Sequence, residues 1–297
     1  MNASSQLGVS VLTKWLSGQL WQETAEYYLD QMQRSILFMD TLRQRGNNRL
    51  EHEQKGSPPV LAYDYETIIF GRDLPKPANY DLLRIIPFHE DIDSTKRPYV
   101  IIDPRAGHGP GIGGSKLASQ VGVALERGHP VYFISFVRHP EPNQNLAAIT
   151  EAKAYYLEKI CLWHPESTEP CVIGNCQAGW AVAMLAAKRP ELMGPVILNG
   201  APLAYWAGID GKDVMRYLGG LSGGAWLTSL YGDLGNGHFD GAHLIANFEA
   251  LNPANTLWIK PYRLYANIDT EAALFLKFEL WWTSFFFLST NEMESIV

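Results

Sequence analysis

From residue 97 to residue 202 the sequence alternates between short apolar runs and longer segments with helical periodicity. The apolar runs have the length of strands: "YVIID", "PVYFISF", "CVI" and "GPVILNGAP". The segments between them have the length of helices: "SKLASQVGVALERG", "LAAITEAKAYYLEKICLW" and "AVAMLAAKR". Strands that are apolar along their whole length must be covered on both faces, and helices in the connections provide that cover. The alternation predicts an α/β fold with a mostly parallel sheet and helices on both faces.

Two further regions flank this pattern. From Trp15 to about Arg45, apolar residues recur at helical spacing, and "HEQKGSPP" has the composition of a linker. We expect an N-terminal helical extension with its linker over residues 1–55 and an α/β domain over residues 56–297. Residues 203–260 are rich in Gly, Trp and Tyr without a firm period, which indicates a cap or an insertion over the sheet edge.

Charge and cysteine content exclude several classes of protein. The net charge of −7 gives no electrostatic footprint for nucleic acid. The start of the chain lacks the pattern of a signal peptide, and Lys277 and Glu279 interrupt the longest apolar segment, so no membrane span is predicted. The three cysteines are odd in number and form no CxxC pair, which favours a reduced compartment over a disulfide framework. We expect a cytoplasmic protein.

The segment "CVIGNCQAGWAVAMLAAKR" places a cysteine between a strand and a helix. A nucleophile elbow has this order, with small residues that let the strand and the helix pass closely. Gly174, Ala178 and Gly179 meet that demand around Cys176. We expect the N-terminus of the helix to lower the pKa of the thiol. The alternative is that Cys176 is a small core residue, as we expect of Cys161 and Cys171.

The loop "PRAGHGPGIGG" after the strand "YVIID" has two interpretations. In an acyl-transfer enzyme such a loop supplies an oxyanion N–H, with Gly107, His108 and Gly109 as candidates. The rival is dinucleotide binding, because "GPGIGG" fits GxGxxG between a strand and a helix. The next strand has no acidic residue clearly at its end, and "GPGIGGSK" only approaches a P-loop. The oxyanion interpretation is favoured because it explains both this loop and the cysteine turn.

Several segments carry a family resemblance: "MQRSILFMDTLRQRGNN", "NYDLLRI", "GHPVYFISFVRHPEPNQN", "GNCQAGW", "PVILNGAPL" and "WWTSFFFLSTNEMESIV". Together they resemble the DUF3141 group, related to the poly(3-hydroxyalkanoate) synthases of the α/β-hydrolase superfamily. Such synthases use a lipase-like box with cysteine in place of serine, and Gly174, Asn175 and Cys176 match its first half. Ala178 stands where the box usually carries its second glycine, with Gly179 one place later. The resemblance implies an α/β-hydrolase-like fold.

The resemblance also implies that the acid and base that serve Cys176 lie beyond Val297, in a part of the fold missing from this chain. In α/β-hydrolases these residues follow the nucleophile in the order acid, then histidine. Within the chain, the candidates after Cys176 are His238, His243 and Asp240, in "GNGHFDGAH". This glycine-rich segment could also be read as a metal site, but it lacks a helical frame and a clear third ligand, so a solvated loop is favoured.

We therefore expect acyl transfer through a thioester on Cys176, with the N–H groups of Gln177 and of the loop near Gly107 stabilising the oxyanion. By resemblance the acyl group comes from a hydroxyacyl-CoA. Ester or thioester hydrolysis and a non-catalytic interaction module stay open as alternatives. The expected partner is an acyl-CoA or acyl ester, and no metal or redox cofactor is implied. The aromatic segment at residues 281–287 is expected to be a buried helix face, or else to line an acyl channel or contact a homo-oligomer or protein partner.

Overall fold

The computed structural model describes residues 18–88, 91–203 and 226–296, with side chains up to Met293. The chain divides into two compact units. One is formed by residues 1–50 with 252–279, and the other by residues 51–251 with 280–297. The expected boundary at residues 55/56 and the expected cap over residues 203–260 stay predictions, and residues 204–225 lie outside the described part.

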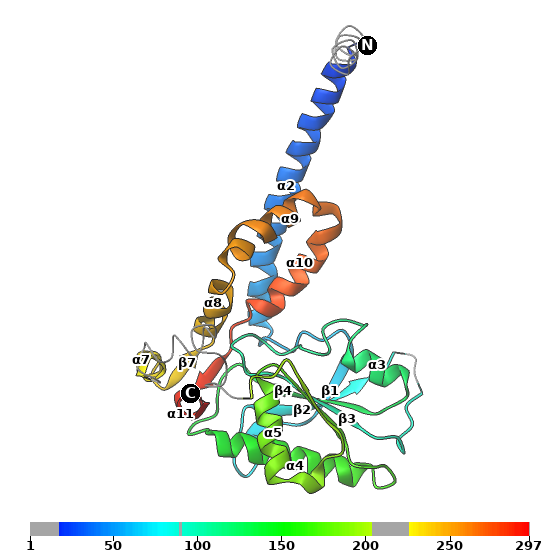
Figure 1. Ribbon diagram of the computed structural model, residues 1–297, viewed down its shortest axis with the longest axis vertical. Coiled ribbons are helices and arrows are strands. Elements are labelled where there is room, and N and C mark those ends of the chain that lie inside the picture. The colour runs from blue at the N-terminus through cyan, green and yellow to red at the C-terminus, as the bar shows by residue number, and fades with distance from the viewer. Residues whose placement is uncertain (1–17, 89–90, 204–225, 297) are drawn as a thin grey trace, which may run out of the picture. The chain divides into compact units, whose positions relative to one another are not determined.

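The second unit is built on a six-stranded sheet (Figure 1) with the order β1-β2-β4-β3-β5-β6. The strands are β1 (Asp64–Ile69), β2 (Tyr80–Ile86), β3 (Tyr99–Ile102), β4 (Val131–Phe136), β5 (Cys171–Asn175) and β6 (Val196–Asn199). Strands β4, β3, β5 and β6 pair in parallel, whereas β1 and β2 add an antiparallel edge. The mostly parallel sheet predicted from the apolar runs is confirmed.

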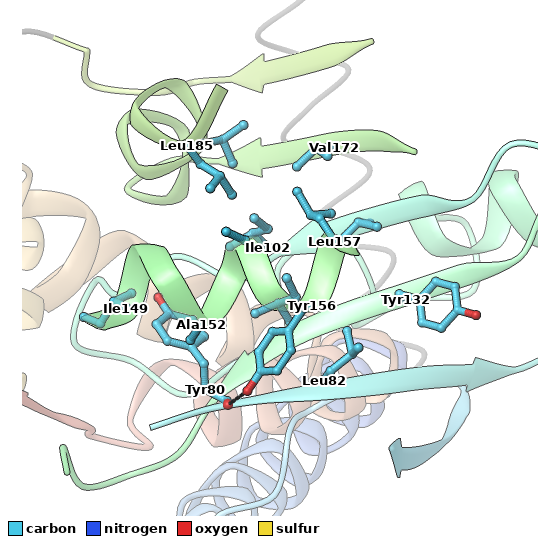
Figure 2. Close-up of a cluster of buried hydrophobic side chains, with 14 of the residues drawn as sticks. Tyr80, Leu82, Ile102, Tyr132, Ile149, Ala152, Tyr156, Leu157, Val172 and Leu185 are labelled. Atoms are coloured by element: carbon cyan, nitrogen blue, oxygen red, sulfur yellow. Dashed lines mark hydrogen bonds between the residues drawn. The ribbon is translucent and has the colours of Figure 1, made fainter. Parts of the chain in front are cut away.

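Helices cover both faces of this sheet because its central strands β3, β4 and β5 are buried along almost their whole length. One face packs against α4 (Leu146–Trp163) and α5 (Ala178–Lys188), and the other packs against α3 (Gln120–Glu126). Figure 2 shows the first core, in which Ile102 and Val172 of the strands meet Leu157 and Leu185 of the helices. The hydroxyl of Tyr156 donates to the backbone oxygen of Tyr80 over 2.6 Å, so α4 is also held to β2 by a buried hydrogen bond.

The remaining elements of this unit follow the sheet. Short 3-10 turns occur at η1 (Gly71–Asp73) and η2 (Pro190–Leu192), and α7 (Trp226–Leu234) and α8 (Ala242–Ala250) flank β7 (His238–Asp240). Strand β7 pairs antiparallel with β8 (Phe287–Ser289), and α11 (Thr290–Ile296) follows. The expectation of a loop around His238 and of a helix through residue 287 was wrong here, because these segments pair as short strands of three residues each.

The first unit packs α2 (Gln19–Gln54) against α9 (Lys260–Ala266) and α10 (Ile268–Trp282), with a π-helical turn η3 (Asn255–Ile259) before α9. Arg34 donates to the backbone oxygen of Ala266 over 2.8 Å, and Tyr265 donates to the side chain of Gln31 over 2.7 Å. Glu279 is buried between Arg45 and Lys260. Helix α2 accounts for the helical periodicity of the N-terminal sequence.

Candidate functional site at the cysteine turn

Cys176 occupies the turn between β5 and α5 with a backbone φ of 50°. A non-glycine residue rarely adopts this left-handed conformation, which costs about 1–3 kcal/mol and concentrates at functional sites. The turn is held by a bond from the Cys176 N–H to the backbone oxygen of Asn199, over 2.9 Å. A second bond of 2.9 Å runs from the Gly179 N–H to the backbone oxygen of Cys176. The strand, turn and helix therefore have the geometry of a nucleophile elbow.

The small residues around Cys176 are required by close packing. A Cβ atom at Gly179 would lie 2.0 Å from the Cβ of Ala201, and one at Gly174 would lie 2.8 Å from a methyl of Val182. Ala178 is buried in the first turn of α5. Of the pair Ala178 and Gly179, for which the sequence predicts close packing, Gly179 is the residue at which a Cβ atom would collide with a neighbour.

The pKa of the Cys176 thiol is raised in this setting, mainly because the group is partly buried. The Gln177 N–H bonds to the sulfur and opposes this shift, while the charge of Asp103 adds to it. The expectation that the helix N-terminus lowers the pKa is corrected, because the loss of water around the sulfur outweighs the single N–H that faces it. Half-buried Cys161 and buried Cys171 also have raised thiol pKa values, again because of burial.

Asn175, immediately before the cysteine, is buried and has its own hydrogen-bond partners. Its side-chain oxygen accepts from Gln120 over 2.9 Å and from Asn199 over 3.2 Å. Asn175 thereby ties α3 and β6 to the end of β5 beneath the turn. Its contribution in this structure is to position the elbow.

The glycine loop after β3 is organised by Asp103. One carboxylate oxygen accepts from the N–H groups of Gly111 and Ile112, over 2.8 and 3.1 Å. Asp103 is fully buried, and burial raises the pKa of its carboxyl well above the usual value. In a dinucleotide-binding loop these amides and a helix start would face a phosphate. Here both amides are bonded to Asp103, and α3 begins only at Gln120.

The three proposed oxyanion residues of this loop, Gly107, His108 and Gly109, are all buried. Gly107 has a φ of 93°, and its oxygen accepts from the Phe286 N–H over 3.0 Å. The His108 ring packs 4.3 Å from the ring of Trp281, and burial lowers its pKa to about 4. The aromatic segment at residues 281–287 thus packs on this loop. Among the described residues no interaction joins Cys176 to Gly107, His108 or Gly109, whereas the Gln177 N–H does face the sulfur.

The in-chain candidates for acid and base have other partners. His243 stacks on Tyr231 with ring centroids 4.1 Å apart, and His238 is exposed beside Phe287. Asp240 accepts from the N–H of Ala242 over 2.9 Å, at the start of α8. Within the described ranges no interaction joins these three residues to Cys176, and no group of His, Cys, Asp or Glu is arranged to hold a metal ion.

Buried charged residues close to the elbow were missed by the sequence interpretation. Arg105 forms an ion pair with Glu292, and both side chains are almost fully buried. Lys153 is also buried, on the face of α4 that packs on the sheet. A signal for Lys153 was present: it follows Ile149 by four residues and precedes Tyr156 by three, which places it on the apolar stripe of the helix. The partner of Arg105 had no signal, since Glu292 lies 187 positions away.

The sheet, the helices on both of its faces and the strained turn at Cys176 define an α/β-hydrolase-like protein. The chain belongs to the DUF3141 family, described as "Protein of unknown function (DUF3141)", which matches residues 30–297. A Rhizobium meliloti protein described as "Uncharacterized protein in ackA 5'region" is 55% identical over 273 residues. That match covers 91% of this chain and 37% of the relative, so the chain spans little more than a third of the relative's length.

Solved structures with similarity to the chain include proteins described as hydrolases. One is 2-hydroxy-6-oxo-6-phenylhexa-2,4-dienoate hydrolase from Rhodococcus sp. strain RHA1, at 16% identity and a TM-score of 0.37, covering 80% of this chain and 75% of that one. Another is a predicted CIB-like hydrolase from Thermoplasma acidophilum, at 14% identity and a TM-score of 0.33, covering 48% and 64%. Separately, none of the helices in the described ranges has the length and apolar character needed to cross a bilayer.

Proposed function

We propose that the α/β unit catalyses acyl transfer through a thioester on Cys176. The observation that carries this proposal is the φ of 50° at Cys176, in a turn between β5 and α5 that tolerates only small neighbours. Holding a residue in strained geometry costs stability, and an elbow uses that geometry to present a nucleophile. The Gln177 N–H at the sulfur supports the same assignment, because an oxyanion formed there would gain a donor.

In the proposed reaction the sulfur attacks the acyl carbonyl carbon, forming a carbon–sulfur bond. The bond to the leaving alcohol or thiol then breaks, and the thiol proton ends on that leaving group. An acceptor hydroxyl takes the acyl group in the transfer reaction, and water takes it in hydrolysis. Because the pKa of the Cys176 thiol is raised, the first step needs a proton acceptor. By resemblance to the synthases, we propose that this proton acceptor lies in sequence that the longer Rhizobium meliloti relative has and this chain does not.

A second candidate reaction, ester or thioester hydrolysis, uses the same cysteine. The two differ in the acceptor, so the products separate them. With a hydroxyacyl-CoA, both reactions release CoA when Cys176 is acylated. Transfer then gives oligomers of the hydroxy acid, whereas hydrolysis gives the free hydroxy acid. The proposed substrate class is an acyl-CoA or acyl ester. An assembly through the aromatic segment at residues 281–287 stays a separate proposal, although Phe286 of that segment is itself buried in the core.

The experiment is a single-turnover reaction of the chain with p-nitrophenyl butyrate, followed by mass spectrometry of the intact protein. We expect one acyl group on Cys176, released p-nitrophenol in stoichiometric amount, and little turnover afterwards, since loss of a general base costs about 10²–10⁴-fold in rate. Cys176→Ala should remove the acyl group, and Cys161→Ala, at another half-buried cysteine, should not. Absence of acylation at any pH would favour the non-catalytic module. Sustained turnover lost in His238→Ala or His243→Ala would place the base within this chain.

A further inference from the structure

A small pocket opens beside the first turn of α5, next to the cysteine elbow. Gln177 and Trp180 line it together with buried Arg105, Lys153 and Glu292. It is narrow, because its lining residues leave space for about one water-sized group, such as a single oxygen of a ligand.

Lys153 is the unusual member of the pocket. Its side chain is 2% exposed, and its ammonium lies 4.6 Å from the centre of the Tyr80 ring. Within the described part of the chain the ammonium of Lys153 has no hydrogen-bond or ion-pair partner, so it rests on the aromatic face of Tyr80. An ammonium without an acceptor is costly to bury, because the aromatic face replaces only part of the lost hydration.

The neighbouring charges do not neutralise this lysine. Glu292 accepts from Arg105 and from Gln144, so both of its carboxylate oxygens are engaged. Arg105 also donates to Asn79 over 2.6 Å, and its charge disfavours the ammonium form of Lys153. When Lys153 is protonated, Arg105 and Lys153 are two cations against the one anion of Glu292, which leaves an excess of one positive charge at the pocket.

The walls of the pocket limit what can enter it. Ile149 and Ala181 contribute apolar surface, and residues of the first turn of α5, an 11-residue helix, line the pocket. A helix N-terminus favours negative charge. The pocket therefore suits a small anion with an apolar end. The positive charge and the free N–H donors of Lys153 match the anionic oxygen, and the apolar walls match the apolar end.

We infer that this pocket takes the end of a small carboxylate, one oxygen of which accepts from the ammonium of Lys153. The ligand is either a free carboxylate or the terminal carboxylate of an acyl substrate. The second case rests on the proposed function. Binding is linked to protonation of the lysine. Burial first, and the charge of Arg105 after it, lower the pKa of Lys153 to about 7, against the opposing charge of Glu292. Tyr80, the other titratable group that faces it, has a pKa raised far above its usual value by burial and stays neutral.

The primary experiment measures the thermal unfolding midpoint of the chain in increasing sodium acetate at constant ionic strength. A ligand of the folded state raises the midpoint with concentration. We expect acetate to do so, with an apparent dissociation constant that increases about tenfold for each pH unit above 7, because only the protonated lysine binds. Lys153→Met should abolish the effect. The matched control is Lys159→Met on the same helix, whose ammonium lies over Tyr155 outside the pocket and whose loss should leave acetate binding unchanged.

Two results would overturn the inference. Acetate could fail to raise the midpoint of the wild-type chain, or raise it equally in Lys153→Met. Inorganic phosphate, a larger tetrahedral anion, tests whether the site selects ligands by size and shape. Phosphate binding as tight as that of acetate would also contradict a carboxylate site. The pH dependence is measured on the wild-type chain, so the inference stays testable even if a variant is poorly folded.

A second experiment separates the two sources of carboxylate. Cys176 is acylated with the p-nitrophenyl monoester of succinic acid and, in parallel, with p-nitrophenyl butyrate. A rate preference of about tenfold for the succinyl ester that disappears in Lys153→Met would assign the pocket to the substrate end. Acetate binding without that preference would assign it to a free carboxylate. If neither ester acylates Cys176, the proposed function fails while the acetate experiment still decides the site.

Discussion

Cys176 and Asp103 follow the neighbouring parallel strands β5 and β3, where burial, and after it the charge of Asp103, raises the pKa of the Cys176 thiol. We predict that alkylation of Cys176 by iodoacetamide is slow near neutral pH and accelerates throughout the alkaline range, because only the thiolate reacts. The measurement is the modification rate at Cys176 as a function of pH, by mass spectrometry. A rate that levels off below about pH 8 would contradict the raised pKa.

Asp103→Asn tests the electrostatic part of that relationship. The asparagine oxygen can still accept from the N–H groups of Gly111 and Ile112, so the loop keeps its anchor. Loss of the negative charge lowers the pKa of the thiol, and at any pH at which Asp103 is ionised the variant should react faster than the wild type. Cys161 provides an internal reference, since Asp103 is not among the groups that shift its pKa. Equal rates at Cys176 in both proteins would show that burial alone controls the thiol.

Gly179→Ala should destabilise the α/β unit. The new Cβ would lie 2.0 Å from the Cβ of Ala201, so the helix or the chain after β6 must move, at a cost of about 1–3 kcal/mol. Gly46→Ala is the comparison, because no atom lies within 4 Å of its added Cβ and alanine favours helix by up to about 1 kcal/mol. Urea unfolding of both variants measures the change in the free energy of unfolding, which should be negative for Gly179→Ala and positive for Gly46→Ala. An unchanged free energy in Gly179→Ala would mean that the elbow can relax.

Lys153→Met should stabilise the protein most at neutral pH and below. The pKa of Lys153 falls from its ordinary value of 10.5 to about 7 on folding, so the unfolded chain binds more protons between these values. Wild-type stability therefore rises as pH increases from about 7 to 10.5, and this contribution is lost as pH falls. Lys153→Met has no lysine to deprotonate on folding, so its stability lacks this pH dependence. The variant should be more stable than the wild type by roughly 3–5 kcal/mol at pH 7 and by far less near pH 10. Unfolding free energies at the two pH values would show no such convergence if the lysine were charged in the folded state.

Glu292→Gln should be strongly destabilising. The Arg105 and Glu292 side chains are 4% and 1% exposed, and removing one partner of a buried pair leaves an uncompensated charge that costs about 3–5 kcal/mol. Glu66→Gln breaks a 2.6 Å ion pair with Arg84 in the same unit, where both side chains are more than half exposed, and should change stability little. Similar losses in both variants would argue against a special role for burial.

The parallel part of the sheet and the helices around it could be predicted from the sequence because apolar runs and helical periodicity are local signals. Strand "CVI" and helix "AVAMLAAKR" also located the turn at Cys176. Strands β7 and β8 could not be found this way, since three residues carry no period. The direction of the thiol pKa depends on burial and on Asp103, a residue 73 positions earlier by sequence number, and neither is visible in the turn itself.

The order in which this chain can acquire its contacts follows from the bond between Arg34 and Ala266, which joins residues 232 positions apart. During synthesis from the N-terminus, α2 is complete long before α9 exists, so its polar contacts to Ala266 and Tyr265 form only after the intervening strands have emerged. Glu292 reaches Arg105 across 187 positions, so the same delay applies to the buried charges beneath the elbow. Long-range closure of this kind slows folding. On a ribosome, the nascent chain therefore carries α2 without its bond to Ala266, and Arg105 without Glu292, until those two later residues have been translated.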